Sequence, residues 1–175
     1  MPELAIQFST SPAFASGIIR RLCHSAFSHV DIVVNDAKES GLLGVSGPDH
    51  KTGDPGGVRL RVNPPWQYKG KPKIAKLKTT EKVRSAVIKI GYAQIGKPFD
   101  DGALWSFLGD SPFGDRDWRS VNSWFCSEFV IYCLEQAKFF PYPLVAVKDR
   151  VTPADCLLLL NPFMSSANIQ EFLDD

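Results

Sequence analysis

The stretch FSHVDIVV, residues 27 to 34, decides the interpretation of the fold because its side chains alternate in character along the chain. Such alternation is typical of a β-strand that turns one face toward a protein core. One face of the expected strand carries only branched apolar residues, namely Val30, Ile32 and Val34. His29 and Asp31 lie together on the opposite face. The sequence therefore predicts a strand that holds a titratable pair away from its wholly apolar face.

Further strands and helices are expected on both sides of this stretch. Alternation, or short apolar runs bounded by turn residues, predicts strands at residues 3–9, 41–47, 57–63 and 72–80. Helical spacing and capping signals predict helices at residues 11–24, 80–95, 100–110 and 152–160, and a further helix that starts near residues 123–125. Strands come first and mostly helices follow, which favours an α+β domain with a small antiparallel sheet over a doubly wound parallel sheet.

Composition limits the classes of function. With 175 residues, of which 44% are apolar and 22% charged, the chain fits one compact domain spanning residues 1–175. The net charge of +1 gives no overall field that would attract nucleic acid or a membrane surface. The longest purely apolar run, residues 156–160, is far below the roughly 20 residues that span a bilayer. We therefore expect no nucleic-acid partner and no membrane span, whereas the oligomeric state stays open.

Cysteine usage and the first residues point to a reducing environment. The four cysteines form no CxxC pair, and a chain of this size folds without disulfide bonds, so reduced thiols in a cytoplasmic setting are expected. The N-terminus lacks the basic start, apolar run and small-residue cleavage site of a secretory signal. No ligand spacing among the cysteines and the three histidines supports a zinc site, so no metal is expected.

A run of lysines precedes the helix expected at residues 80–95. These lysines occupy positions 69, 71, 73, 76 and 78 and overlap the strand expected at residues 72–80. The simpler interpretation is a solvated strand face that discourages pairing at a sheet edge. An anion-binding surface is the alternative.

Cys126 stands where a polar stretch gives way to an apolar helix. It is the first residue of an inward stripe that continues at positions 129, 130, 133, 134 and 137. Unpaired N–H groups and the positive end of the helix dipole favour a thiolate in the first turn, and these N–H groups also suit an oxyanion. His29 is the best-placed imidazole to accept the thiol proton, because it projects from a rigid strand. The alternative is structural, since a free cysteine and a strand histidine are both common in protein cores.

Three segments in this order carry a resemblance to a known family: SHVDIVV at 28–34, IGKPFD at 95–100 and WFCSEFVIYCLEQ at 124–136. They resemble the circularly permuted branch of the NlpC-type papain-like cysteine hydrolases, the YiiX-like group, which is related to the lecithin retinol acyltransferase-like proteins. The similarity runs from about residue 27 to 135, and the CSE at the helix start is its most specific part. It implies a permuted papain-like domain with a small antiparallel sheet or half-barrel packed against helices.

Carried over residue by residue, the resemblance makes Cys126 the nucleophile and His29 the general base. For the third residue, which orients the imidazole, two candidates stay level: Ser46, on the following strand, and Asp31. Asp31 lies two residues from His29, about 6.6 Å along a strand, so a direct bond requires the two side chains to lean together.

Four further residues are expected around the substrate, namely Trp124, Phe99, Asp100 and Glu128. Asp100 falls on the family's aspartate, where it is suited to hold a helix start, and Glu128 is suited to cap the cysteine helix. Phe99 replaces a tyrosine that is frequent in the family, which removes a hydroxyl from that position.

The expected function is hydrolysis of an amide or ester bond through an acyl-thioester, with no cofactor. The resemblance implies a peptide, peptidoglycan-like or acyl substrate without choosing among them. A role on cell walls requires release by lysis, or a phage-encoded protein, because no signal or wall-binding module is evident. A noncatalytic binding or assembly module on the same fold, and an acyltransferase that uses the same two residues, are the alternatives.

Overall fold

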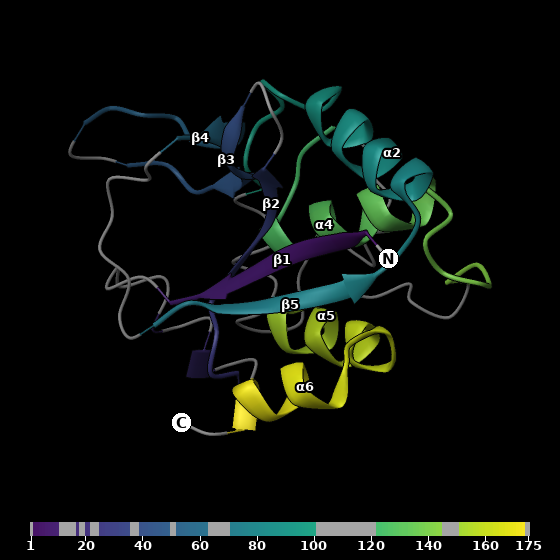
Figure 1. Ribbon diagram of the computed structural model, residues 1–175. Helices are drawn as coiled ribbons and strands as arrows, with labels where there is room; N and C mark the ends of the chain where they lie inside the picture. The colour runs from purple at the N-terminus through teal and green to yellow at the C-terminus, as the bar shows by residue number, and fades with distance from the viewer. Residues whose placement is uncertain are drawn as a thin grey trace.

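The computed structural model describes residues 2–10, 17, 20–21, 25–35, 39–49, 52–62, 71–100, 122–144 and 151–173. Five strands in this part of the chain form one antiparallel sheet: β1 (Glu3–Ser9), β2 (His29–Asn35), β3 (Ser40–Ser46), β4 (Gly57–Arg61) and β5 (Lys73–Lys78). Their order, β4-β3-β2-β1-β5, leaves β4 and β5 as the edges of an open sheet (Figure 1). The predicted α+β architecture with an antiparallel sheet is confirmed.

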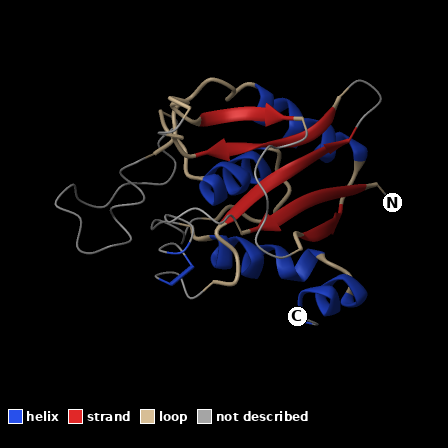
Figure 2. Ribbon diagram, turned by 90° about the vertical axis from the view of Figure 1, so that its left-hand side faces the viewer, coloured by secondary structure: helices blue, strands red, loops and turns tan. Residues whose placement is uncertain are grey.

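The helices follow the strands, as expected. The described helices are α2 (Glu81–Tyr92), α4 (Cys126–Gln136), α5 (Pro153–Leu160), the short 3₁₀ helix η1 (Asn161–Phe163) and α6 (Ser166–Leu173). Figure 1 shows α2 and α4 against one face of the sheet and α5 and α6 beside β5, and Figure 2 shows the strands side by side with the helices behind them. Most of the helices expected at residues 11–24 and 100–110 lies outside the described residues.

Two of the helix starts follow from capping residues that the sequence makes visible. Thr80 accepts a hydrogen bond from the N–H of Val83 at the start of α2. At the start of α5, the Thr152 hydroxyl accepts from the N–H of Asp155, whose carboxylate accepts in return from the N–H of Thr152. Such reciprocal capping satisfies N–H groups that the helix itself leaves unpaired. Both predicted helix starts are confirmed.

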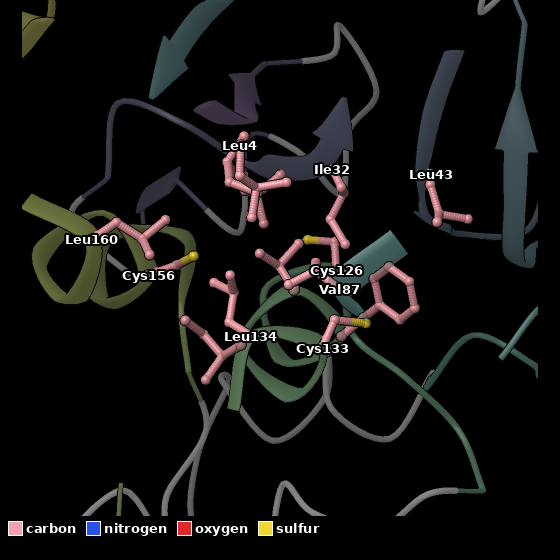
Figure 3. Packing of buried hydrophobic residues seen from close by; sticks show 14 of the residues in the cluster. Leu4, Ile32, Leu43, Val87, Cys126, Cys133, Leu134, Cys156 and Leu160 are labelled. Carbon is pink, nitrogen blue, oxygen red and sulfur yellow. The ribbon is translucent and has the colours of Figure 1, made fainter. Parts of the chain in front are cut away.

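The apolar face of the sheet and the inner faces of the helices form one core. Figure 3 shows side chains from β1, β2, β3, α2, α4 and α5 gathered in this cluster. Leu4, Ile32 and Leu43 represent the strands, and Cys133 and Leu134 represent α4, all of them without exposed surface. Each large apolar side chain buried in this way contributes about 1.5–3 kcal/mol. The core therefore fixes α4, and with it Cys126, against the strand that begins with His29.

The other face of the central strands carries polar side chains. Gln7 of β1 lies opposite Asp31 of β2, and Leu42 of β3 lies opposite both Val33 of β2 and Arg61 of β4. Residues directly opposite in an antiparallel pair share a face, and so do residues two apart on one strand. Asp31 and Arg61 therefore stand on the same face of the sheet, two strands apart.

The outer edge of β5 is closed by the C-terminal helix α6, which the sequence analysis did not predict. The buried amide of Asn168 donates to the carbonyl oxygen of Ile74 at 2.8 Å and accepts from the N–H of Lys76 at 2.7 Å. These are the groups that a neighbouring strand would otherwise use. Lys76 and Lys78 are exposed, as the solvated-face interpretation predicts, while Asn168 covers the edge. The anion-binding alternative stays a prediction.

No described helix is both long and apolar enough to cross a membrane.

Replacing Asn168 with alanine is expected to lower the free energy of unfolding, because a partly buried carbonyl and a partly buried N–H of β5 lose their partner. Each unsatisfied group costs about 1–3 kcal/mol. Urea denaturation followed by circular dichroism measures this loss. Gln170→Ala, at an exposed position of the same helix, serves as the control and should change stability far less. Equal stability of the Asn168→Ala variant and the unmodified protein would contradict this account of the edge.

Candidate active site

The start of α4 is fixed by its own carboxylate and by the preceding chain. Phe125, which precedes the helix, is extended (φ −92°, ψ 153°), and its N–H donates to Glu128 Oε2 at 3.3 Å. Just before it, Trp124 pairs with the GKPFD segment: the N–H of Asp100 donates to Trp124 O at 3.0 Å, and that of Trp124 donates to Pro98 O at 3.1 Å. Two segments on which the family resemblance rests are therefore hydrogen-bonded to each other at the first turn of the cysteine helix.

Trp124 and Glu128, both expected near a substrate, are buried at the start of α4. The Trp124 side chain has no exposed surface, and its ring packs against Phe129 and Tyr132 with centroid separations of 6.3 and 4.5 Å. Glu128 is 5% exposed and caps the helix. Both side chains serve the interior of the helix start, and their expected contact with a substrate stays a prediction. Sequence spacing alone does not separate a groove wall from a core anchor.

Phe99 and Asp100 lie at the margin of the site and are both half-buried. The Phe99 ring packs 6.0 Å from that of Phe125, measured between centroids, and faces Gly47 just after β3. The backbone of Asp100 is held by Trp124. Their expected contacts with a substrate stay predictions.

His29 begins β2, and its imidazole leans along the strand onto Asp31. Nε2 of His29 lies 3.1 Å from Oδ1 and 3.0 Å from Oδ2 of Asp31. The Asp31 side chain is fully buried, whereas that of His29 is 18% exposed. His29 and Asp31 lie two residues apart along the strand, and they bond because their side chains lean toward each other. Asp31 thus holds the position from which a third residue orients the imidazole.

Ser46, the other candidate for that position, belongs to the neighbouring strand β3. It ends β3 opposite Gly57 and is half-buried. Among the described residues, no hydrogen bond joins its hydroxyl to His29. The geometry therefore favours Asp31 over Ser46 as the partner of the imidazole.

Arg61, at the end of β4, is a member of the site that the sequence analysis missed. Its Nη2 donates to Asp31 Oδ1 and lies 3.3 Å from Nε2 of His29. The Arg61 side chain is only 5% exposed, so the opposite charges of Arg61 and Asp31 are both buried next to the imidazole. The alternation of Arg59 and Arg61 in GVRLR was the available signal, because it places two cations on one face of a strand.

Gly44 of β3 provides the space for this ion pair. A Cβ atom at Gly44 would lie 2.0 Å from Asp31 Oδ1 and 3.3 Å from Arg61 Nη2. No side chain fits at that separation without moving the carboxylate. The absence of a side chain at Gly44 is thus a condition for burying Asp31 between β3 and His29.

Cys126 meets His29 at the end of the sheet. The thiol lies close enough to the imidazole to raise the pKa of His29, and Cys126 Sγ lies 4.0 Å from the carbonyl oxygen of Ser28, the residue before β2. Since Nε2 of His29 faces Asp31, Nδ1 is the ring nitrogen left for the sulfur. Cys126 itself is 2% exposed, whereas the His29 side chain is 18% exposed.

The charges around the imidazole favour its protonated form. Burial alone would lower the pKa of His29, but the charge and hydrogen bond of Asp31, followed by the hydrogen bond and charge of Cys126, raise it from 6.5 to about 10. Burial would raise the pKa of Asp31, yet His29 and then Arg61 keep it below its ordinary value of 3.8. An imidazolium beside a sulfur stabilises a thiolate, which is the nucleophilic form of cysteine.

Two other buried cysteines provide a contrast. Burial raises the pKa of the Cys133 thiol, and burial followed by the charges of Cys126 and Asp155 raises that of Cys156 well above its usual range. These two thiols stay protonated at neutral pH. The fourth cysteine, Cys23, lies outside the described residues.

Comparison with known proteins finds similarity at the level of structure. No family model matches the sequence, and no curated protein matches it. Among solved structures, the crystal structure of the metalloprotein YiiX from Escherichia coli O157:H7 superimposes with a TM-score of 0.52 at 18% sequence identity, covering 79% of this chain and 67% of that one. The two chains share a fold. This agrees with the resemblance to the YiiX-like group, while papain-like chemistry and circular permutation stay predictions.

Gly44→Ala is expected to disrupt the site, because the new Cβ must displace the Asp31 carboxylate from His29. Overpacking of this kind costs about 1–3 kcal/mol of stability. Gly47→Ala is the matched control, since its Cβ would meet the Phe99 ring at an ordinary 3.8 Å. Thermal unfolding and a histidine NMR titration measure the two effects. A Gly44→Ala protein that keeps both its stability and the high pKa of His29 would contradict the proposed packing.

The raised pKa of His29 predicts a specific dependence of stability on pH. Between pH 6.5 and about 10 the folded protein holds a proton that the unfolded chain has released, so the stabilising contribution of His29 is complete below pH 6.5 and is lost as pH rises through about 10. The free energy of unfolding should therefore exceed that of a His29→Gln variant most at about pH 6 and least above about pH 10. Urea denaturation of both proteins at several pH values measures this difference, and a pH-independent difference would contradict it.

Proposed function

We propose that this protein is a cysteine-dependent hydrolase that cleaves an amide or ester bond through an acyl-thioester, with Cys126 as nucleophile and His29 as general base and acid. The observation that carries the proposal is the position of His29, whose imidazole bonds to the buried Asp31 carboxylate and lies close enough to Cys126 for the thiol to affect the pKa of His29. A nucleophile next to a base that is itself oriented by a third group is the arrangement that activates thiols and hydroxyls in enzymes.

In the first half of the reaction, His29 already holds the proton of the Cys126 thiol, and the sulfur attacks the carbonyl carbon of the substrate. The new C–S bond forms as the carbonyl π bond opens, which leaves a negative charge on oxygen. The N–H groups in the first turn of α4 are suited to hold this oxyanion. The C–N or C–O bond then breaks, and His29 donates its proton to the leaving amine or alcohol.

In the second half, water releases the acyl group. His29, now neutral, accepts a proton from water while the water oxygen attacks the thioester carbon. The C–S bond breaks, and the carboxylic acid product leaves with Cys126 and His29 as they began. Asp31 stabilises the imidazolium in both halves of the cycle.

The substrate is a peptide, a peptidoglycan-like molecule or another acyl compound, as the family resemblance implies. Transfer of the acyl group to an acceptor other than water would use the same two residues. Analysis of the products distinguishes hydrolysis from acyl transfer. Neither reaction requires a cofactor.

The name of the structural neighbour raises the question of a metal. Among the described residues, no group of three or more histidine, cysteine and acidic side chains could hold a metal ion. In the site itself, the Asp31 carboxylate is already paired with Arg61 and His29. A metal cation that bound this carboxylate would have to displace the guanidinium of Arg61. The described residues do not fit a metal centre, and no step of the proposed reaction uses one.

A noncatalytic binding or assembly module on the same fold is the second candidate function. The observation that favours it is the burial of Cys126, because a thiol that is 2% exposed meets a substrate only where neighbouring side chains give way. In such a module the bonds among Cys126, His29 and Asp31 would serve stability alone.

Alkylation of Cys126 by iodoacetamide tests the hydrolase against the module. An ordinary thiol with a pKa of about 8.5 is about 1% thiolate at pH 6.5, so a thiolate held by His29 should react on the order of tenfold faster after allowance for its lower nucleophilicity. We expect His29→Ala to remove this advantage. Mass spectrometry of the cysteine-containing peptides measures the rate at each site.

The protein contains its own controls for this experiment. Cys133 and Cys156 should stay unmodified at pH 6.5, because their pKa values are raised by burial. The hydrolase would be abandoned for the noncatalytic module if Cys126 reacted no faster at this pH in the unmodified protein than in the His29→Ala variant.

A further inference from the structure

Arg61 makes the contacts that connect β4 to Asp31 and His29 of β2. It ends an edge strand, and its guanidinium reaches past β3 to the carboxylate of Asp31, 30 residues away in the sequence. The Arg61 side chain is 5% exposed, and the Asp31 side chain is fully buried. The same Nη2 atom lies 3.3 Å from Nε2 of His29. Three charged or titratable groups from two strands thus meet in one buried place.

Stability alone is a weak reason for such an arrangement. Removing two opposite charges from water costs several kcal/mol per ion, and apolar residues of similar size often replace a buried ion pair without loss. A carboxylate side chain also rotates with little resistance about its last torsion. An Asp31 without a second partner would therefore have no fixed orientation toward the imidazole.

We propose that Arg61 is a positioning residue for the Cys126–His29 pair: its Nη2 donates to Oδ1 of Asp31, the oxygen to which Nε2 of His29 also bonds at 3.1 Å, and so holds the carboxylate in the orientation in which Nδ1 of the imidazole stays directed at the sulfur. The inference rests on the proposed function for its catalytic meaning, but the positioning itself is a property of the resting protein. Gly44 is also needed for this arrangement, because the absence of a side chain there leaves room for the Asp31 carboxylate to contact both Arg61 and His29.

The charges that face His29 come from three elements. Asp31 of β2 carries the negative charge, Arg61 of β4 the positive one, and Cys126 of α4 the ionisable thiol. Ser9, opposite His29 on β1, is uncharged. Within the described residues, Asp31 is thus the only anion besides a Cys126 thiolate that faces the imidazole, and its orientation decides how the ring is held.

The first test is the alkylation of Cys126 at pH 6.5 in an Arg61→Gln variant. The His29→Ala variant sets the full loss of rate. In Arg61→Gln, the logarithm of the alkylation rate is expected to fall by at least half of that loss. Arg61→Lys should recover part of the loss, because lysine keeps one charged donor for Oδ1. Arg59→Gln is the matched control: Arg59 stands two residues earlier on the same strand and pairs with Asp54 on the surface, so its loss should leave the rate unchanged.

A double variant separates positioning from a general loss of structure and covers the case in which Arg61→Gln alone does not fold. Asp31→Asn removes the group through which Arg61 acts, so adding Arg61→Gln to it should change the Cys126 rate by less than about twofold, the scatter of independent sites. A loss in the Asp31→Asn background as large as in the unmodified protein would overturn the proposal, because Arg61 would then act without Asp31.

The second test does not depend on thiol chemistry. The Nε2 proton of His29, hydrogen-bonded to a buried carboxylate, should give a resolved downfield NMR signal in the unmodified protein and in Arg59→Gln. Arg61→Gln should lose this signal, and its persistence would overturn the positioning role. If Cys126 proves inert while the signal depends on Arg61, the hydrolase fails and the positioning role stands.

Discussion

Asp31 carries a carboxylate into a part of the sheet where none of its side chain is exposed, and the rest of the site follows from the need to compensate that charge. An unpaired buried carboxylate is too costly to remain ionised. Two groups compensate it: the guanidinium of Arg61 and the imidazole of His29. Gly44 leaves the space in which they meet. The high pKa of His29 is thus a consequence of burying Asp31 beside it.

The antiparallel sheet brings these groups together without any local sequence signal. Register places Asp31 and Arg61 on one face, two strands apart, although about 30 residues separate them along the chain. Packing of α4 on the opposite, apolar face sets the position of Cys126, which approaches the sheet at the carbonyl of Ser28, 98 residues earlier. His29 is the first residue of its strand, so its side chain can contact both Asp31 on the polar face of the sheet and Cys126 of α4 on the apolar face. Both halves of the site therefore rest on rigid elements, which is what a precise geometry requires.

Patterns within one element made much of this predictable. Alternation in FSHVDIVV predicted the strand and the shared face of His29 and Asp31, and the apolar stripe from Cys126 predicted the helix that it begins. Contacts between distant elements were not predictable in the same way. The contact of Arg61 with Asp31 depends on register, and the full burial of Trp124 depends on what packs around it, so neither has a signature in its own segment. The role of Asn168 at the sheet edge was not predictable either, because it depends on where α6 packs.

The burial of Cys126 affects the two candidate functions in different ways. In a medium that excludes water, a thiolate and an imidazolium attract each other more strongly than at a surface, so the same burial that hides the sulfur also strengthens the pair. The His29 side chain is 18% exposed, so it is the part of the pair that meets solvent. In the noncatalytic module, an uncharged side chain could fill the space of the imidazole at lower desolvation cost. In the proposed hydrolase, the same partly exposed imidazole would be the group beside which a substrate reaches the hidden sulfur.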